Sequence, residues 1–412
     1  MQLVVFTAHY PYGHGEEFLE NELCVAEEYF ERITIVSMEK SDFGKVRYVP
    51  RNATVVPVRQ NTERILQMLY GLCGLLRIRV WKEFFYARRN TAYSSAAILR
   101  QLMIQEMVMA FVRRNEQRWV KNRFDTVYYS YWLGTNFAFK GGRLQGLKIS
   151  RAHGGDCFFD REYHPYRREA LRNLDYVFPI SEAGREDIIA HYKDAVQGLE
   201  EKVKTARLGI AIPEMLNQYN RTDERTIVTC SNIIQLKRLD LLIDALSEIT
   251  DMNIRWIHFG EGVLRKDMEQ YAEKKLGRKK NIHYEFRGYT PNHELLSFYE
   301  NASIDLFVNC SDVEGIPVSV MEAMAHGIPA IGRNVGGMGE LIHDTCGRLL
   351  PAQTSPQALA DAIQAILGLP AEAYLALRAN ARETVKENYD VEKNYHRLFG
   401  FLKERISCRD AI

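Results

Sequence analysis

The sequence predicts an α/β protein built from two doubly wound parallel sheets, and two observations support this fold class. Short apolar runs alternate with amphipathic stretches along most of the 412 residues, a pattern typical of parallel strands covered by helices. The alternation runs twice, with a polar stretch at 192–204 between the two series. Because such sheets bind ligands at the carboxyl ends of their strands, we expect a site in the cleft between two domains.

The first series indicates a domain at 1–200 and the second a domain at 205–390. Strands of the first are expected at Leu3–Thr7, Ile33–Ser37, Thr54–Val58, Thr126–Ser130, Leu147–Ser150 and Tyr176–Ile180, with a helix at Glu16–Phe30. Strands of the second are expected at Thr226–Cys230, Ile254–Phe259, His283–Phe286, Asp305–Val308 and Pro329–Gly332. Its helices are expected at Arg238–Ile249, Leu264–Lys275, Asn292–Glu300 and Pro356–Leu367.

Composition and charge exclude several classes of protein. Hydrophobic residues make up 46% of the chain and charged residues 26%, which excludes disordered and fibrous proteins. The formal charge of only +1 provides no field that favours nucleic acid. The seven cysteines are scattered and form no CxxC pair, so we expect neither disulfides nor a zinc site, and a cytoplasmic location. The longest uncharged apolar stretch, Ile65–Leu76, is too short to cross a bilayer.

The segment 305–327 carries the strongest functional signal. An apolar strand and a polar loop precede a helix expected to begin at Pro317, a residue favoured in the first helical turn. The amides at such a helix start attract an anion. Glu314 in the loop and Glu322 on the helix are electrostatically odd beside an anion unless they accept hydrogen bonds from ligand hydroxyls. Together these features indicate a sugar nucleotide, which carries both phosphates and hydroxyls.

The spacing of Glu314 and Glu322 inside EGIPVSVMEAMAHGIPAI resembles the E-x7-E motif of glycosyltransferase family 4, whose members are retaining enzymes with the GT-B fold. The resemblance covers most of 205–390. Its further matching segments are Phe259–Gly262, Phe286–Tyr289, Asn334–Glu340, Gly347–Leu350 and Asn232–Asp240. The resemblance implies a donor-binding domain at 205–390, and an acceptor-side domain at 1–200 to which a helix at 391–412 crosses back.

The resemblance also implies roles for single residues. Glu314 would contact the donor sugar, Glu322 would hold the ribose hydroxyls, and Lys237 would neutralise the pyrophosphate, whose charge grows as it leaves. The implied donor-binding set is Gly13, Gly15, Asn232, Lys237, Arg238, Gly288, Glu314, Gly315, Ile316, Pro317, Val318 and Glu322. The family often has an arginine at the position of Asn232. Either Asn232 with backbone amides suffices here, or another cation such as Arg238 compensates.

The first half of the chain matches the family less closely. The loop that contains Gly13 and Gly15 follows the first strand, where the family keeps a glycine-containing loop facing the donor phosphates, and glycine allows such a close approach. His153 ends a strand and precedes two glycines, and it looks like the active-site histidine of the family. The implied catalytic set is therefore His153, Lys237 and Glu314.

These observations predict a hexosyltransferase-type, retaining glycosyltransferase. It would transfer a sugar from a nucleotide-diphosphate sugar to a hydroxyl acceptor, free or lipid-linked, in bacterial cell-surface polysaccharide or glycolipid biosynthesis. A sugar-nucleotide hydrolase or epimerase of the same fold, or a non-catalytic sugar-nucleotide-binding module, are the alternatives. We expect no metal and no cofactor, because no Asp-x-Asp pair flanks a strand and Lys237 with a helix dipole can replace a metal at the diphosphate.

Residues 61–123 interrupt the alternation and are expected to form two or three helices. They contain twelve Lys or Arg and four acidic residues, an excess of eight positive charges, interleaved with apolar residues. A basic amphipathic surface of this kind favours an anionic membrane, which would make the protein peripheral at the inner face of the membrane. Packing of the apolar face on the first domain and pairing with an acidic partner protein are the alternatives.

Overall fold

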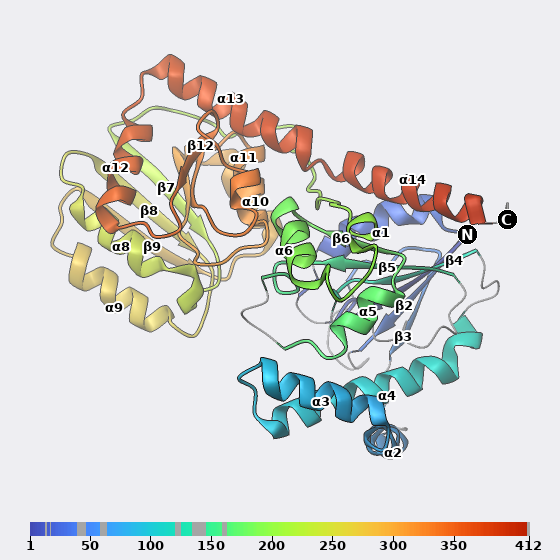
Figure 1. Ribbon diagram of the computed structural model, residues 1–412. Helices are drawn as coiled ribbons and strands as arrows, with labels where there is room; N and C mark the ends of the chain where they lie inside the picture. Colours follow the sequence, from blue (N-terminus) through green and yellow to red (C-terminus); the bar gives the residue numbers. More distant parts are fainter. Residues whose placement is uncertain are drawn as a thin grey trace. The chain divides into compact units, whose positions relative to one another are not determined.

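The computed structural model describes residues 1–12, 15–16, 18–38, 47–57, 64–119, 125–133, 146–158 and 163–409. The chain divides into two compact units (Figure 1). Unit 1 comprises Met1–Gly209 and Val391–Ile412, and unit 2 comprises Ile210–Asp390. Each unit contains one six-stranded sheet, and the strands of both sheets are parallel. The predicted α/β fold class, two doubly wound parallel sheets, is confirmed.

The sheet of unit 1 has the order β3-β2-β1-β4-β5-β6. Its strands are β1 (Gln2–Thr7), β2 (Arg32–Ser37), β3 (Ala53–Pro57), β4 (Thr126–Ser130), β5 (Leu147–Ala152) and β6 (Tyr176–Pro179). Its helices are α1 (Phe18–Tyr29), α2 (Arg64–Leu75), α3 (Ile78–Asn90), α4 (Ser95–Trp119), α5 (Arg167–Asn173), α6 (Glu182–Tyr192), α7 (Leu199–Lys202) and α14 (Val391–Arg409). The order reverses between β1 and β4, which is the switch point of this sheet.

The sheet of unit 2 has the order β12-β11-β10-β7-β8-β9, the same topology as unit 1 read from the other edge. Its strands are β7 (Glu224–Cys230), β8 (Asn253–Phe259), β9 (Ile282–Gly288), β10 (Leu306–Asn309), β11 (Ala330–Arg333) and β12 (Gly347–Leu350). Its helices are α8 (Leu239–Glu248), α9 (Arg265–Leu276), α10 (Asn292–Asn301), α11 (Val318–Ala325), α12 (Pro356–Leu367) and α13 (Ala371–Asn388). The switch point lies between β7 and β10.

Both faces of each sheet are buried. Along β1, Val4 and Phe6 belong to one hydrophobic cluster and Leu3 and Val5 to another, as expected when successive side chains point to opposite faces. Strand β7 alternates between two clusters in the same way. This explains why the strands read as continuous apolar runs, because a parallel sheet covered on both sides has no polar face.

All eleven predicted strands and all five predicted helices are present, with described ends shifted by two residues or fewer; Val58 lies outside the described residues. The polar stretch at 192–204 does not separate the units, which divide between Gly209 and Ile210. Its apolar side chains Val196, Leu199 and Val203 are buried in the core of unit 1, and Val203 pairs with Val177 of β6. Strand β12 and helices α5, α6, α7 and α13 lie outside the predicted elements.

The basic segment contains three helices, α2, α3 and α4, in agreement with its lack of strand signals. Helix α2 packs against α4 through glycines, since a Cβ atom at Gly71 would lie 2.8 Å from Met103 Cγ. Helix α3 adds Val80 and Ala87 to the core of unit 1. Among the described residues, no helix combines the length and the apolar character that a membrane crossing requires.

Candidate functional site

The loops that carry Lys237 and Glu314 begin side by side at the switch point of unit 2. Strands β7 and β10 are parallel neighbours, so both end at the same edge of the sheet. The loop after β7 contains Lys237, in a short 3-10 helix at Gln235–Lys237, and the loop after β10 contains Glu314. Since the chain leaves the two strands in opposite directions here, the loops frame a crevice of the kind that holds ligands in such sheets.

A direct ion pair joins these two residues. Lys237 Nζ lies 2.5 Å from Glu314 Oε1, and Asn309 Nδ2 donates to the same oxygen at 3.2 Å. The side chains are only 22% and 10% exposed, and reduced access of water strengthens the attraction between the charges. The pair holds one cation and one hydrogen-bond acceptor at the switch point. Asn309, at the end of β10, was not anticipated, although its position as the last strand residue is a usable signal.

Helix α11 begins a few residues after Glu314. Pro317 precedes its first residue and carries no side-chain cap, while its carbonyl accepts from the amides of Val320 and Met321 at 3.1 and 3.2 Å. The Gly315 carbonyl accepts from the Gly337 amide at 2.7 Å, which fixes the loop. The amides of Val318 and Ser319 precede the first amide that is bonded to the Pro317 carbonyl, and they can donate to an anion. Ile316 is 5% exposed and anchors this turn in the core.

Glu322 lies on α11 and is held by the start of α10. Asn292 Nδ2 donates to Glu322 Oε1 at 2.8 Å. Burial raises the pKa of the Glu322 carboxyl to about 7, and the hydrogen bond from Asn292 opposes part of that rise. Near neutral pH the carboxyl is therefore divided between its protonated and ionised forms. Ligand hydroxyls that donate to it would favour the ionised form.

Arg238 has two carboxylate partners in unit 2. Its Nε donates to both oxygens of Asp240 at 3.1 and 3.2 Å, and one terminal nitrogen donates to Asp312 Oδ1 at 3.3 Å. These hydrogen bonds, led by the one to Asp240, raise the pKa of the guanidinium. Asn232 is exposed at the predicted position of the absent arginine. If Arg238 replaces the absent arginine in binding phosphate, its guanidinium must leave Asp240 and Asp312.

Gly288 is the last residue of β9. Its backbone lies close to the side chain of Glu261, and it is not part of the Lys237–Glu314 ion pair. Its φ is 78°, and a Cβ atom would lie 2.6 Å from Glu261 Oε1, so only glycine fits without strain. Its carbonyl accepts from the Gly260 amide at 2.9 Å.

His153 follows β5 in unit 1 and is 7% exposed. Its ring lies against Tyr131 and Trp132, with centroids 4.5 and 4.7 Å away. Its Nε2 is buried without a hydrogen-bond partner among the described residues. Burial, helped by the nearby positive charge of Arg151, lowers the pKa of His153 to about 3, so the imidazole is neutral at physiological pH and its free nitrogen is available to a ligand group.

The glycine-containing loop after β1 already holds an anion of its own. The Glu16 carboxylate accepts from the backbone amides of Ala8, His9 and Tyr10 at 2.8, 2.8 and 2.7 Å, and from Trp132 Nε1 at 2.6 Å. These three amides are consequently occupied and do not face a donor phosphate in this structure. Gly15 is described, with φ of 92°, whereas Gly13 lies outside the described residues. Sequence analysis placed Glu16 in the following helix and missed this role; its φ of 59° places it before that helix.

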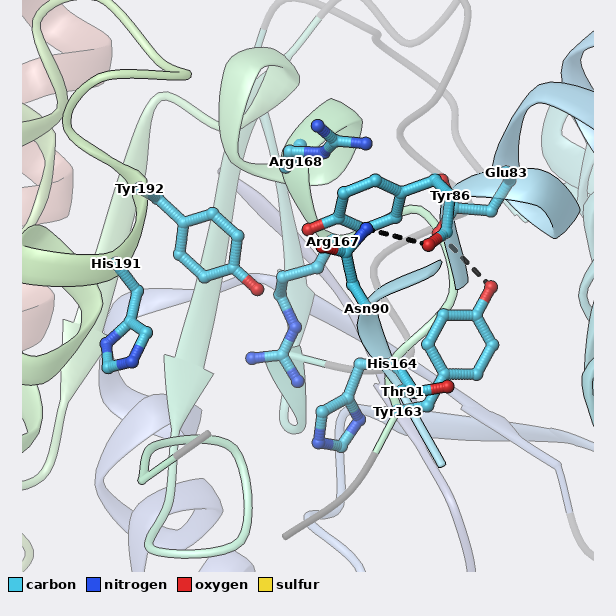
Figure 2. Close-up of a pocket in the computed structure, with 10 residues that line it drawn as sticks. All are labelled: Glu83, Tyr86, Asn90, Thr91, Tyr163, His164, Arg167, Arg168, His191 and Tyr192. Atoms are coloured by element: carbon cyan, nitrogen blue, oxygen red, sulfur yellow. Dashed lines mark hydrogen bonds between the residues drawn. The ribbon is translucent and has the colours of Figure 1, made fainter. Parts of the chain in front are cut away.

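A cavity of about 270 Å³ in unit 1 adjoins the loop that follows His153 (Figure 2). It is lined by Glu83, Tyr86, Asn90, Thr91, Tyr163, His164, Arg167, Arg168, His191 and Tyr192. The Arg168 guanidinium carbon lies 3.5 Å from the centroid of the Tyr86 ring. His164 Nε2 lies 3.3 Å from the Gly155 carbonyl oxygen, and Arg167 donates to the Asp156 carbonyl at 2.8 Å. Sequence analysis missed this cavity, because its lining comes from three separate segments.

The two parallel sheets of like topology give the chain the GT-B fold. The fold is shared with Anabaena HepE, whose crystal structure in complex with UDP superposes with a TM-score of 0.65 at 16% identity, over 98% of this chain and 100% of HepE. Residues 212–384 match the family model described as glycosyl transferases group 1. Most of unit 2 is therefore similar to the group 1 glycosyl transferases.

Two relatives carry the name of a colanic acid biosynthesis glycosyltransferase, WcaL. The Salmonella typhimurium protein is 22% identical over 98% of this chain and 100% of its own length. The Escherichia coli protein is 25% identical over 64% of this chain and 65% of its own length. The match to the latter thus spans slightly under two thirds of that relative.

Proposed function

We propose that the protein is a retaining glycosyltransferase that transfers a sugar from a nucleotide-diphosphate sugar to a hydroxyl acceptor. The observation that carries the proposal is the Lys237–Glu314 ion pair at the switch point of unit 2, followed by the start of α11. A cation and free amides suit a diphosphate, and carboxylates suit sugar and ribose hydroxyls. The UDP complex of HepE supports a nucleotide donor. The WcaL names support a role in bacterial cell-surface polysaccharide or glycolipid biosynthesis.

In the proposed mechanism, Lys237 and the first amides of α11 bind the diphosphate. When the bond between the anomeric carbon and the phosphate oxygen breaks, its electron pair stays on the phosphate, so negative charge grows beside Lys237. A fixed cation at that place stabilises the transition state more than the bound donor. Glu322 accepts hydrogen bonds from the ribose, for which its ionised form is the better acceptor.

Retention follows from attack on the same face from which the phosphate leaves. The acceptor hydroxyl forms the new bond to the anomeric carbon and gives its proton to the departing phosphate oxygen, so no enzyme carboxylate is consumed. Glu314 already accepts from Lys237 and Asn309, and we assign it to donor-sugar hydroxyls rather than to nucleophilic attack. Neutral His153 is proposed to offer Nε2 to the donor sugar.

We propose that the acceptor binds in unit 1, in the cavity of Figure 2. Its aromatic rings can cover the apolar face of a sugar, and its amide, hydroxyl, imidazole and guanidinium groups can bond hydroxyls or an acidic substituent. Figure 2 also shows the Glu83 carboxylate bonded to the Tyr163 hydroxyl, at 3.2 Å.

A donor and product assay tests this function. The protein should bind one class of nucleotide sugar in a thermal-shift panel and convert it with acceptor to a product of unchanged anomeric configuration, as read from NMR coupling constants. An inverted product would contradict retention, and a trapped glycosyl adduct on any carboxylate would contradict direct same-face attack.

The same assay without acceptor separates the alternatives. A hydrolase or epimerase would release free sugar or a new sugar nucleotide at the full rate, whereas a binding module would change nothing. Metal independence is part of the proposal, with Lys237 in the position that a metal ion would otherwise serve. Activity unchanged by EDTA is the expected result, and activity restored only by added Mg²⁺ or Mn²⁺ would contradict it.

A further inference from the structure

Helix α2 packs its small residues against α4 and exposes its large apolar residues to solvent. Gly71 and Gly74 face α4, where a Cβ atom at Gly74 would collide with the side chain of Glu106. Leu69, Leu72 and Leu76 follow the opposite side at spacings of three and four residues, and they are 51%, 52% and 84% exposed. Close glycine contact to α4 leaves this leucine stripe in water.

Helix α3 repeats the arrangement. Its inward side carries Val80, Glu83 and Ala87, all buried. At the same spacings of three and four residues, Ile78, Trp81 and Phe85 follow the outward side and are 76%, 43% and 58% exposed. Two consecutive helices therefore each expose an apolar stripe, and a soluble helix ordinarily buries such a stripe. We call the surface formed by Leu69, Leu72, Leu76, Ile78, Trp81 and Phe85 the α2–α3 face.

Cations accompany this face, and exposed acids do not. Lys82 and Arg89 are exposed on α3 on the same side of the helix as Trp81 and Phe85. The single acidic residue between 69 and 90 is Glu83, which is 9% exposed and accepts from the Tyr166 amide at 3.0 Å. Glu106 of α4 is buried and binds Arg77 and Arg79 at 2.7 and 2.5 Å. The surface that remains is apolar and positive.

We propose that the α2–α3 face docks on an anionic lipid bilayer. Exposed Leu, Ile, Phe and Trp side chains enter the boundary between headgroups and acyl chains, and flanking Lys and Arg side chains meet anionic headgroups. A second copy of the chain fits the face less well, because a two-fold contact would bring Lys82 and Arg89 toward their own copies. The proposal does not depend on the activity of unit 2, and it makes the protein peripheral rather than spanning.

Vesicle binding tests the proposal directly. The full-length protein is sedimented with vesicles of phosphatidylcholine alone, and with vesicles containing one quarter phosphatidylglycerol, at 0.05 and 0.5 M NaCl. We expect binding to the anionic vesicles at low salt, at least tenfold weaker binding at high salt, and little binding to neutral vesicles. In addition, bromine-labelled acyl chains in the anionic vesicles should quench tryptophan fluorescence of the wild-type protein. No binding to anionic vesicles at low salt, or no quenching on binding, would overturn the proposal.

Matched variants locate the contact. Leu76→Ser with Ile78→Ser removes apolar side chains, and Lys82→Gln with Arg89→Gln removes charge; each pair should weaken binding at least tenfold. Arg88 is left unchanged because it donates to the Tyr93 carbonyl. The controls are Val263→Ser, a valine in unit 2 that is 87% exposed, and Lys274→Gln with Arg278→Gln, two exposed cations of unit 2. Control proteins should bind as wild type.

Two outcomes would refute this assignment. Binding that survives both α2–α3 pairs, or that is lost equally in the controls, would place the contact elsewhere. Concentration-dependent dimerisation abolished by the same substitutions, without vesicle binding, would identify a second copy as the occupant. Because all four substituted side chains are exposed, the variants should unfold at the wild-type temperature, which thermal unfolding verifies.

Discussion

Helix α11 and helices α2 and α3 are rich in apolar residues, yet they orient these residues in opposite ways. Helix α11 buries Val320, Met321, Ala323, Met324 and Ala325 and offers only its start and one carboxyl to the site. Helix α2 buries glycines and exposes leucines. The side of a helix that packs most closely against its neighbour therefore decides which residues are buried. In α2 glycines form that side, so the larger leucines remain exposed. In the two proposals, α11 acts through its start, and helices α2 and α3 act through their exposed sides.

The largest effect that can test this comparison is expected at the Lys237–Glu314 ion pair of unit 2. Lys237→Ala should lower kcat by about 100- to 1,000-fold, the cost of removing a group that stabilises transition-state charge, while donor affinity changes much less. Steady-state kinetics with a donor-binding isotherm measures the two separately. Lys274→Ala is the control, because Lys274 is an exposed cation on α9 of the same unit. An equal decrease of kcat in both variants would contradict a specific role of Lys237 in stabilising transition-state charge.

The next effect concerns Glu322, which would sharpen the distinction between donor binding and catalysis. Glu322→Ala should weaken donor binding by about 1.5–3 kcal/mol, the range for a hydrogen bond to a charged group, with kcat less affected. With its pKa raised to about 7, the wild-type carboxyl should bind donor more tightly as pH rises through 7, and donor binding below pH 7 should release a proton. Titration calorimetry in buffers of different ionisation enthalpy reports that proton. Donor binding that does not depend on pH would contradict the role of the ionised Glu322 carboxyl.

The same raised pKa has a consequence for stability with a defined sign. Folding favours the protonated carboxyl, so this contribution is complete below about pH 4.5 and is lost as pH rises through 7. Glu322→Gln should therefore unfold less readily than wild type at pH 8, by up to about 3 kcal/mol, and the gain should vanish near pH 4. Urea unfolding at the two pH values measures the difference. If the variant is stabilised equally at both pH values, packing rather than the raised pKa would explain the difference.

The comparison can be broken in unit 1 by altering the glycine face of α2. Gly74→Ala should destabilise unit 1 by about 1–3 kcal/mol, because the added methyl collides with Glu106 in a packed contact. Gly400→Ala in α14 is the matched control: no atom lies within 4 Å of its Cβ position, so it should stabilise by about 1 kcal/mol through helix propensity. Hydrogen exchange of α2 amides should increase only in the first variant.

The smallest effect is expected in the cavity of unit 1. Arg168→Ala should raise the acceptor KM by about fivefold, equivalent to about 1 kcal/mol for the loss of one hydrogen bond to the acceptor, without changing donor affinity. Arg172→Ala is the control on the same helix, because Arg172 donates to the Ala195 carbonyl outside the cavity lining. Acceptor kinetics at saturating donor tests both. A change in donor affinity would assign the cavity to the donor.

The fold could be predicted from sequence because its signals are local. Strand–helix alternation predicted the sheets, and the loop–helix segment around Glu314 predicted an anion site. The partner of Glu322, Asn292, and the partner amides of Glu16 could not be predicted, since each contact joins segments apart in sequence. The outward orientation of α2 was also unpredictable, because periodicity identifies an apolar stripe but not the side from which a neighbour approaches.

The ion pairs of unit 2 have a further consequence for how the donor responds to ionic strength. Lys237 is neutralised by Glu314, and Arg238 by Asp240 and Asp312, so the protein supplies its own counterions. A ligand phosphate that enters would displace a tethered carboxylate rather than salt ions from solution. Donor affinity should consequently vary little between dilute and concentrated salt, because the released counterion remains part of the chain.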